Sequence, residues 1–269
     1  MKVLTVYAHP NPKSFNRAVL EHFTAGLKDA GHTSEVVDLY AIKFNPVVDS
    51  KDSPSWITGD TPLPVLESMN LKQLVLDSCR NPLQRFLARR WLRDKDLPSV
   101  ARAIHEGMSR DVIEQQRKVA EADGLAFISP VYFVGFPAIL KGWIERVFTL
   151  GFAFELSSEG WAGDVDGRIP LLKHQKALII NTTIFDEKSY ETGIEQAMTR
   201  LIDDWCLRYP GIKNVEHVYF HAMHDFDADK RRSYLEQAYR LGKGFALSGD
   251  AISRAQQSGR HADRPVRTA

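Results

Sequence analysis

Short apolar runs alternate with amphipathic stretches along most of this chain, and each pattern predicts a different element. Apolar runs bounded by polar residues predict strands, whereas apolar residues spaced three and four apart predict helices. Strands are expected at residues 3–8, 33–39, 124–129, 176–182 and 215–221. Helices are expected at residues 16–30, 110–122, 138–148, 194–209 and 228–247. Repeated strand–helix units favour an α/β fold with a parallel sheet and helices on both faces.

Residues 53–107 interrupt this alternation with prolines followed by an arginine-rich amphipathic stretch. The apolar residues of that stretch are expected to pack while the interleaved arginines stay charged. They are Leu83, Phe86, Leu87, Trp91 and Leu92. Long insertions are often lids or interface elements, but a solvated helical decoration explains the segment equally well. We expect one domain over residues 1–248 with a helical insertion at about 53–107, and a polar tail over 249–269.

An aromatic loop follows the strand that ends at Ser129, and it is bounded by Pro130 and Pro137. The rings of Tyr132 and Phe133 lie between these prolines. In an open α/β sheet, ligands bind outside the carboxyl ends of the strands, so a planar ring system could dock on this loop. Alternatively, the loop is a bulky turn that packs on the protein's own core.

A polar turn follows the first strand and leads into the first helix. His9 lies in this turn, and Ser14 and Asn16 lie where the helix begins. A hydroxyl and an amide beside the free N–H groups of a helix start form an anion site. The glycine-rich fingerprints of dinucleotide and nucleoside-triphosphate sites are absent, so these side chains suggest a flavin phosphate. A simple capped helix is the alternative.

Together these segments resemble the NAD(P)H:quinone oxidoreductase family, the DT-diaphorase type of flavodoxin-like flavoenzyme. The resemblance rests on Ala-His-Pro-x-x-x-Ser-Phe-Asn at residues 8–16, Pro-Val-Tyr-Phe-Val-Gly-Phe-Pro-Ala-Ile-Leu-Lys-Gly-Trp at 130–143 and Gly-Phe-Ala-Phe at 151–154. It covers most of residues 1–52 and 108–246. It implies a flavodoxin-like, doubly wound sheet of five parallel strands in the order 2-1-3-4-5, with the ligand between strands one and three.

The resemblance also implies a set of cofactor-binding residues. Those near the N-terminus would hold the flavin phosphate region, and those in the aromatic loop would lie near the flavin ring. The set is His9, Ser14, Phe15, Asn16, Pro130, Val131, Tyr132, Phe133, Val134, Thr182, Thr183 and Tyr190. FAD is the first choice of cofactor and FMN the second, with NAD(P)H as the hydride donor.

A third matching segment departs from the family pattern. Thr182, Thr183 and Tyr190 match in spacing, but Ile184 and Phe185 stand where family members have glycines. Glycine allows a backbone to approach a ligand closely, so this loop must sit differently or use side-chain contacts.

The family histidine that assists the tyrosine aligns with Glu195 when one residue is gapped. Tyr190 and Glu195 are therefore the candidate catalytic pair, in which Glu195 would have to be protonated to act as an acid. The alternative, which we favour, is that Glu195 lies in the first turn of a helix and interacts with the helix dipole.

The candidate substrate pocket is more apolar than in related enzymes. Phe154 and Leu156 stand where relatives tend to carry tyrosines. Trp161 either covers the pocket or only packs within its own loop.

Histidines and aspartates cluster between His217 and Asp227, which invites a metal interpretation. On a strand, however, His217 and His221 share a face with a spacing too wide for one ion, and no matching third ligand lies upstream. We expect no metal here, but a solvated strand end.

Charge and cysteine content narrow the function classes. The 35 basic and 34 acidic residues give a net charge of +1. This balance does not call for nucleic acid or an anionic membrane as a binding partner, although local charged patches are possible. Electron-carrier flavodoxins are usually strongly acidic, so that class is disfavoured. Cys79 and Cys206 are isolated and fit a reducing cytosol. Without a secretion signal or a long apolar run, we expect a cytoplasmic protein without membrane insertion.

The expected function is that of a homodimeric flavoenzyme that oxidises NAD(P)H and passes hydride to a quinone or a similar electron-poor aromatic acceptor. The alternative is a flavin-binding regulatory or partner subunit without major turnover of its own.

Overall fold

The computed structural model describes residues 1–48, 52, 56–224 and 227–246, and the chain forms two compact units. The first unit contains Met1–Lys43, Glu121–Leu140 and the described residues from Lys173 onward. The second unit contains Phe44–Ala120 and Lys141–Leu172. The expected polar tail at 249–269 lies outside the described residues.

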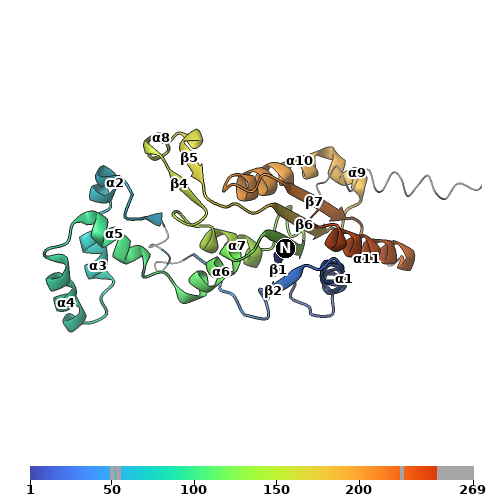
Figure 1. Ribbon diagram of the computed structural model, residues 1–269, viewed down its shortest axis with the longest axis horizontal. Coiled ribbons are helices and arrows are strands. Elements are labelled where there is room, and N and C mark those ends of the chain that lie inside the picture. The colour runs from blue at the N-terminus through green and yellow to red at the C-terminus, as the bar shows by residue number, and fades with distance from the viewer. Residues whose placement is uncertain (49–51, 53–55, 225–226, 247–269) are drawn as a thin grey trace, which may run out of the picture. The chain divides into compact units, whose positions relative to one another are not determined.

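A five-stranded parallel sheet forms the core of the first unit (Figure 1). Its strands are β1 (Lys2–Tyr7), β2 (Thr33–Asp38), β3 (Gly124–Pro130), β6 (Lys176–Thr182) and β7 (Val215–Phe220). Their spatial order is β2-β1-β3-β6-β7. Because β6 and β7 are the fourth and fifth strands of this sheet along the chain, the order 2-1-3-4-5 expected from the sequence is confirmed.

The register brings the carboxyl ends of the central strands to one edge of the sheet. Tyr7 pairs with Ile128, and Pro130 pairs with Thr182. The Val131 N–H donates to the Thr182 carbonyl at 2.9 Å, which continues the ladder beyond β3. Every residue of β3 and β6 is buried, as is usual for the central strands of a parallel sheet with helices on both faces.

Helices cover both faces of this sheet. The helices α1 (Phe15–Asp29) and α11 (Ala228–Lys243) pack on one face, where alternate strand residues such as Ile128 and Ile180 meet Phe23 of α1. The other face carries a helical segment made of α9 (Glu187–Ser189), the π-helix η3 (Tyr190–Ile194), α10 (Glu195–Met198) and the π-helix η4 (Thr199–Arg208). The helix expected at 194–209 therefore forms largely with the wider π-helical hydrogen bonding.

The second unit contains a group of helices and a small hairpin. The helices are α2 (Leu63–Ser68), α3 (Leu71–Asp77), α4 (Pro82–Leu92), α5 (Leu97–His105) and α6 (Arg110–Ala120). The antiparallel strands β4 (Phe154–Leu156) and β5 (Arg168–Pro170) flank α8 (Ser158–Trp161) and the 3₁₀ turn η2 (Val165–Gly167). The helix α7 (Ala138–Val147) begins in the first unit and continues into the second.

The packing expected for α4 is largely wrong. Leu92 is buried and joins Leu66, Leu71 and Val100 in a small core, but the other four apolar residues of the helix are exposed. They are Leu83, Phe86, Leu87 and Trp91. The helix contacts its unit on one side only, so the amphipathic pattern overestimated how much of it would be covered.

The two helices on the first face of the sheet approach each other through glycines. A Cβ atom at Gly26 of α1 would lie 2.1 Å from the Tyr239 carbonyl oxygen. A Cβ atom at Gly242 of α11 would lie 2.0 Å from the Phe23 carbonyl oxygen. No side chain fits at either distance, so this crossing requires glycine on both helices.

We expect Gly26→Ala and Gly242→Ala each to lower the free energy of unfolding by about 1–3 kcal/mol, because overpacking must push α1 and α11 apart. The loss should appear although alanine is the better helix former by about 1 kcal/mol. Urea denaturation measures it. Gly135→Ala is the control, because no atom lies within 4 Å of its Cβ position. Equal stabilities for all three variants would contradict the close approach.

Candidate functional site

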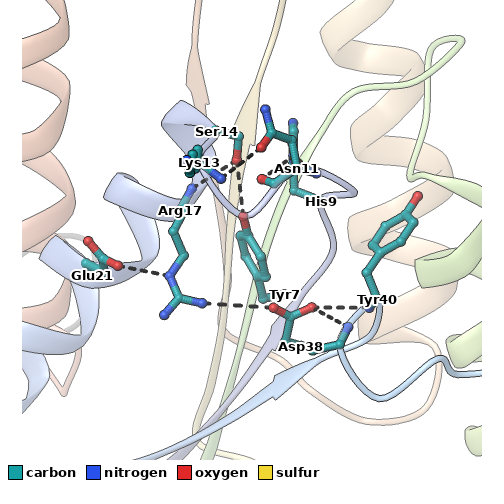
Figure 2. A network of polar contacts seen from close by, with 10 residues as sticks. Tyr7, His9, Asn11, Lys13, Ser14, Arg17, Glu21, Asp38 and Tyr40 are labelled. Carbon is teal, nitrogen blue, oxygen red and sulfur yellow. Dashed lines mark hydrogen bonds and ion pairs between the residues drawn. The ribbon is translucent and has the colours of Figure 1, made fainter.

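The first turn of α1, the candidate anion site, is capped by Ser14 beside the carboxyl end of β1 (Figure 2). The Ser14 Oγ accepts a hydrogen bond from the Arg17 N–H and lies 3.3 Å from the buried Tyr7 hydroxyl. The N–H groups of Phe15 and Asn16 have no partner among the described residues, since the first turn of a helix lacks intrahelical acceptors. These N–H groups and the helix dipole favour an anionic group.

Arg17 does not serve this anion site directly. Its guanidinium lies 2.9 Å from a Glu21 oxygen and 3.9 Å from an Asp38 oxygen, as Figure 2 shows. The positive character of the site therefore comes from backbone N–H groups rather than from this cation.

His9 lies in the turn before α1 and lines the same region. Its Nδ1 lies 3.0 Å from the Asn11 nitrogen and 3.1 Å from the Asn11 carbonyl oxygen, so it accepts from the first or donates to the second, depending on the tautomer. Burial lowers the pKa of His9, which favours the neutral ring at pH 7. In the tautomer that accepts from the Asn11 N–H, the proton lies on Nε2, and Nε2 is then a hydrogen-bond donor for a ligand.

A surface pocket of about 290 Å³ lies at the carboxyl ends of β1, β3 and β6. Most of its lining residues are ones that the sequence pointed to as cofactor ligands. They are His9, Phe15, Asn16, Pro130, Val131, Tyr132, Thr182 and Thr183. The remaining lining residues are Ile184, Met223 and His224.

Asn16 supplies the most direct sign that a ligand belongs in this pocket. Its side chain is buried, its Nδ2 is 2.8 Å from the Thr182 Oγ1, and its Oδ1 has no partner among the described residues. A buried amide oxygen without a donor is costly. If the amide is turned over, Oδ1 accepts from the Thr182 hydroxyl and Nδ2 can donate to an anion in the pocket.

The aromatic loop after β3 has a strained backbone. Phe133 and Val134 have φ angles of 48° and 62°, which non-glycine residues rarely adopt. The hydrogen bond from the Tyr132 N–H to the Gly135 carbonyl closes this turn at 3.0 Å. Tyr132 lines the pocket, whereas the Phe133 side chain is fully exposed and Val134 is about half exposed. Strain of this kind is common where a loop serves a binding site.

The contacts of the loop after β6 show what holds its backbone in the absence of the expected glycines. Ile184 and Phe185 point largely to solvent. The Thr183 hydroxyl donates to the Phe185 carbonyl at 2.7 Å, and the Met223 N–H donates to the Thr183 carbonyl at 2.9 Å. The backbone is therefore held by the loop after β7, which places Met223 and His224 at the pocket.

Tyr190 is buried beside this loop. Its ring packs against Tyr219 and His221, with centroid separations of 5.2 and 5.0 Å. Burial raises the pKa of the Tyr190 hydroxyl, while a hydrogen bond with Thr183 opposes that shift. Tyr190 itself does not line the pocket, whereas Thr183 does.

Glu195 and Tyr190 line a different, open depression of about 470 Å³ along the helical segment, together with polar residues such as Arg200. Glu195 is exposed in the first turn of α10, and no hydrogen bond joins it to Tyr190 among the described residues. This position fits the helix-dipole interpretation of Glu195.

The interpretation of His217 as part of a solvated strand end is wrong. Its side chain is only 4% exposed, with Nδ1 2.8 Å from an Asp203 oxygen and Nε2 2.9 Å from the Asn181 Oδ1. The Asn181 Nδ2 donates to the Ser129 carbonyl, so Oδ1 must be the atom that faces His217. The ring is therefore held between the Asp203 carboxylate and the Asn181 amide oxygen, and the Tyr219 hydroxyl also lies 3.2 Å from its Nδ1.

This chain of contacts from Asp203 through His217 and Asn181 to Ser129 ties η4 and β7 to the carboxyl ends of β6 and β3. We call it the strand-end network. The tyrosine at 219 extends it, because its ring stacks on His217 with a centroid separation of 4.2 Å.

The three predicted substrate residues all belong to the second unit. Phe154 and Leu156 lie in β4, and Trp161 ends α8. Leu156 and Trp161 line a cleft of about 30 Å³ with residues that include Thr58 and Thr61. The Ser157 hydroxyl accepts from the Gly160 N–H and so fixes the turn that presents Trp161.

No group of three or more potential metal ligands occurs among the described residues. None of the helices in the described ranges is both long and apolar enough to span a bilayer.

The pocket residues that the sequence missed are those of the loops after β6 and β7. In the sequence, Ile184 stands out only because it replaces a glycine of the family pattern. His224 stands out only as a possible metal ligand. The His224 Nδ1 lies 2.8 Å from the Ile184 carbonyl oxygen, so the two loops are joined directly. The signal available in the sequence was positional: both follow strands whose carboxyl ends adjoin the site.

Comparison with known proteins places the chain among flavodoxin-like proteins. A family model described as "flavodoxin-like fold" matches residues 1–241. The chain is also similar to a solved structure, the NAD(P)H:quinone oxidoreductase from Methanothermobacter marburgensis. The identity is 28%, the TM-score is 0.65, and the match covers 91% of this chain and 98% of that one.

Two curated relatives carry related names. The ribosyldihydronicotinamide dehydrogenase-like protein traD of Penicillium crustosum is 28% identical over 89% of this chain and 80% of its own length. The ribosyldihydronicotinamide dehydrogenase [quinone] of Mus musculus is 34% identical over 64% of this chain. The match spans only 61% of the mouse protein's length.

We expect Asp203→Ala to lower the free energy of unfolding by about 1–3 kcal/mol, because it leaves the buried His217 Nδ1 without its carboxylate partner. Arg200→Ala breaks an ion pair with Asp204 on the same helix, in which Arg200 is 69% exposed. That control should lose less than about 1 kcal/mol. Urea denaturation compares the two variants. Similar losses would show that the strand-end network contributes no more than a surface pair.

Proposed function

Since the chain belongs to the family of proteins with the flavodoxin-like fold, we propose that it is a flavin-dependent NAD(P)H oxidoreductase. It would transfer two electrons as hydride, by way of the flavin, to a quinone or a similar electron-poor aromatic acceptor. The observation that carries this proposal is the convergence of His9, Asn16 and Thr182 on one pocket between the carboxyl ends of β1, β3 and β6. The names of the relatives support the same activity.

The donors of the pocket fit the phosphate-bearing end of a flavin. Several hydrogen-bond donors there would bind an anion. They are the free N–H groups of Phe15 and Asn16, the Asn16 amide and the His9 Nε2. At about 290 Å³ the pocket is small for a whole cofactor, so it would hold one end of it. Tyr132, Phe133 and Val134 would border the ring system.

The bound flavin would supply the redox chemistry, and the protein would orient it and stabilise its charge. Tyr190 is our candidate for the group that donates a hydrogen bond to the reduced ring. Its raised pKa keeps the hydroxyl protonated, and therefore a donor, throughout the neutral range. Phe154, Leu156 and Trp161 are proposed to form the apolar substrate surface, and Glu195 is retained only as a helix-dipole residue.

FAD is our first choice of cofactor and FMN our second. The choice rests on the resemblance to the longer quinone reductases, and either flavin offers the phosphate that the α1 site would bind. We propose a cytoplasmic enzyme that acts on small molecules and binds no nucleic acid.

The absorbance spectrum of the purified protein tests the proposal, together with mass spectrometry of the released cofactor and turnover of NADPH with a quinone. Flavin absorbance with rapid turnover supports it. A protein that holds no flavin even after incubation with FAD or FMN would contradict it. A flavin-bound protein without turnover would point instead to a partner subunit.

Ser14→Ala combined with Asn16→Ala should release most of the flavin, because it removes two polar groups from the phosphate site. Hydrogen bonds to charged groups are worth about 1.5–3 kcal/mol each, so affinity should fall at least a hundredfold. Flavin content after gel filtration measures the effect. Asn81→Ala is the control, since Asn81 caps α4 of the second unit in the same manner and does not line the pocket. Full flavin occupancy in the double variant would refute the phosphate assignment.

Tyr190→Phe should keep its flavin but slow flavin reduction by NAD(P)H by about a hundredfold or more, as expected for loss of a donor to developing negative charge. Stopped-flow absorbance at the flavin band provides the rate. The control is Tyr239→Phe, which removes a hydroxyl that bonds to Asp29 on the surface. An unchanged rate would reduce Tyr190 to a packing residue.

We also propose a symmetric homodimer. Phe133, Ile184 and Phe185 border the pocket loops with more than half of each side chain exposed, and such a patch is typical of an interface. Phe133→Ser with Phe185→Ser should therefore shift the protein towards monomer in light scattering. Val165→Ser, an exposed apolar change in the second unit, should not. A wild-type protein that is monomeric with flavin bound would contradict the dimer.

A further inference from the structure

The helix α4 turns a stripe of large apolar side chains towards solvent. Leu83, Phe86, Leu87 and Trp91 are 67%, 63%, 54% and 41% exposed. Their spacing of three, four and eight residues from Leu83 puts them on one face, which we call the α4 stripe. Leu92 is the one buried residue of α4, all of which the structure describes. At about 100° per residue, Leu92 lies on the opposite side of the helix from Leu83. The helix is therefore attached to its unit by the face opposite the α4 stripe.

The same segment concentrates positive charge. Residues 80–95 contain six basic residues and one acidic residue, a net charge of +5, whereas the whole chain carries +1. The basic residues are Arg80, Arg85, Arg89, Arg90, Arg93 and Lys95. Arg85 lies 3.5 Å from an Asp77 oxygen, but Arg89, Arg90 and Arg93 are exposed and pair with no carboxylate among the described residues.

Charge complementarity selects the kind of surface that covers the stripe. A second copy of α4 would place arginines against the same arginines in a symmetric contact, which repels. An anionic surface attracts all of them.

The position of Arg90 favours lipid over a protein groove. It lies about 20° around the helix from Leu83, inside the stripe. A protein groove would have to supply a buried carboxylate for this guanidinium. At a bilayer the side chain reaches out to a lipid phosphate while its aliphatic stem stays among the apolar residues.

We propose that α4 docks the protein on an anionic lipid bilayer. The α4 stripe enters the boundary between head groups and acyl chains, and the arginines contact lipid phosphates. The helix lies on the surface and does not span the membrane. If the proposed function holds, the enzyme then meets an acceptor quinone dissolved in the lipid. That consequence rests on the proposed function, whereas lipid binding itself does not.

Co-sedimentation of the full chain with vesicles tests the proposal. The wild-type protein should bind vesicles that contain phosphatidylglycerol, bind pure phosphatidylcholine much more weakly, and be released by salt. Phe86→Ser with Trp91→Ser should weaken binding by about tenfold or more. Arg89→Gln with Arg90→Gln should weaken it by about fivefold per arginine. The matched control is Val165→Ser with Ile169→Ser, two apolar residues of the same unit that are 52% and 44% exposed.

Circular dichroism and urea denaturation establish that each variant folds. Lack of binding by the wild-type protein to anionic vesicles overturns the proposal, as does full binding by both α4 variants. Self-association that Phe86→Ser with Trp91→Ser abolishes, without lipid binding, assigns the stripe to a second copy and overturns it too. Binding to poly-glutamate but not to vesicles assigns the stripe to an acidic protein and likewise overturns the proposal. Vesicle binding by a protein that holds no flavin supports docking and removes only its link to quinones.

Discussion

Polar groups at the carboxyl ends of fully buried strands must find partners inside the protein, and this requirement shapes the first unit. Neither β3 nor β6 has a residue open to solvent. Asn181 therefore bonds to Ser129 on one side and to His217 on the other, while Thr182 is bonded by Asn16. These contacts join the ends of β3 and β6, the middle of β7 and the start of α1 into one rigid edge.

That rigid edge allows the adjoining loops to hold unfavourable conformations. The turn at Phe133 and Val134 keeps positive φ angles because Val131 before it is hydrogen-bonded to β6. The loop after β6 is held in place by Thr183, whose hydroxyl and carbonyl are both hydrogen-bonded. A binding pocket is more precise when strands position it than when free loops do. Asn16, whose buried amide oxygen has no partner among the described residues, also lines the pocket at this edge.

Local patterns predicted the sheet, and the family resemblance pointed to most of the residues that line the pocket. Strand periodicity gave the five strands, and two motifs gave residues as distant as Asn16 and Thr182. Sequence reasoning failed where a residue's role depends on a partner that no local pattern indicates. His217 looked solvated because its partner Asp203 lies 14 residues earlier, in a helix on the opposite side of a turn. The hairpin of β4 and β5 was missed because strands of three residues carry no detectable alternation.

The second unit shows why a helix can form and still leave its apolar residues exposed. With Leu92 alone buried, packing contributes little to α4, so local interactions must hold it. Asn81 caps its first turn by accepting from the Gln84 N–H, Pro82 occupies the favoured first position, and leucine, glutamine, alanine and arginine are all good helix formers. Arginines in the last turn also complement the helix dipole. Because the helix does not need the α4 stripe for its own folding, those four side chains are free to serve a contact outside the chain.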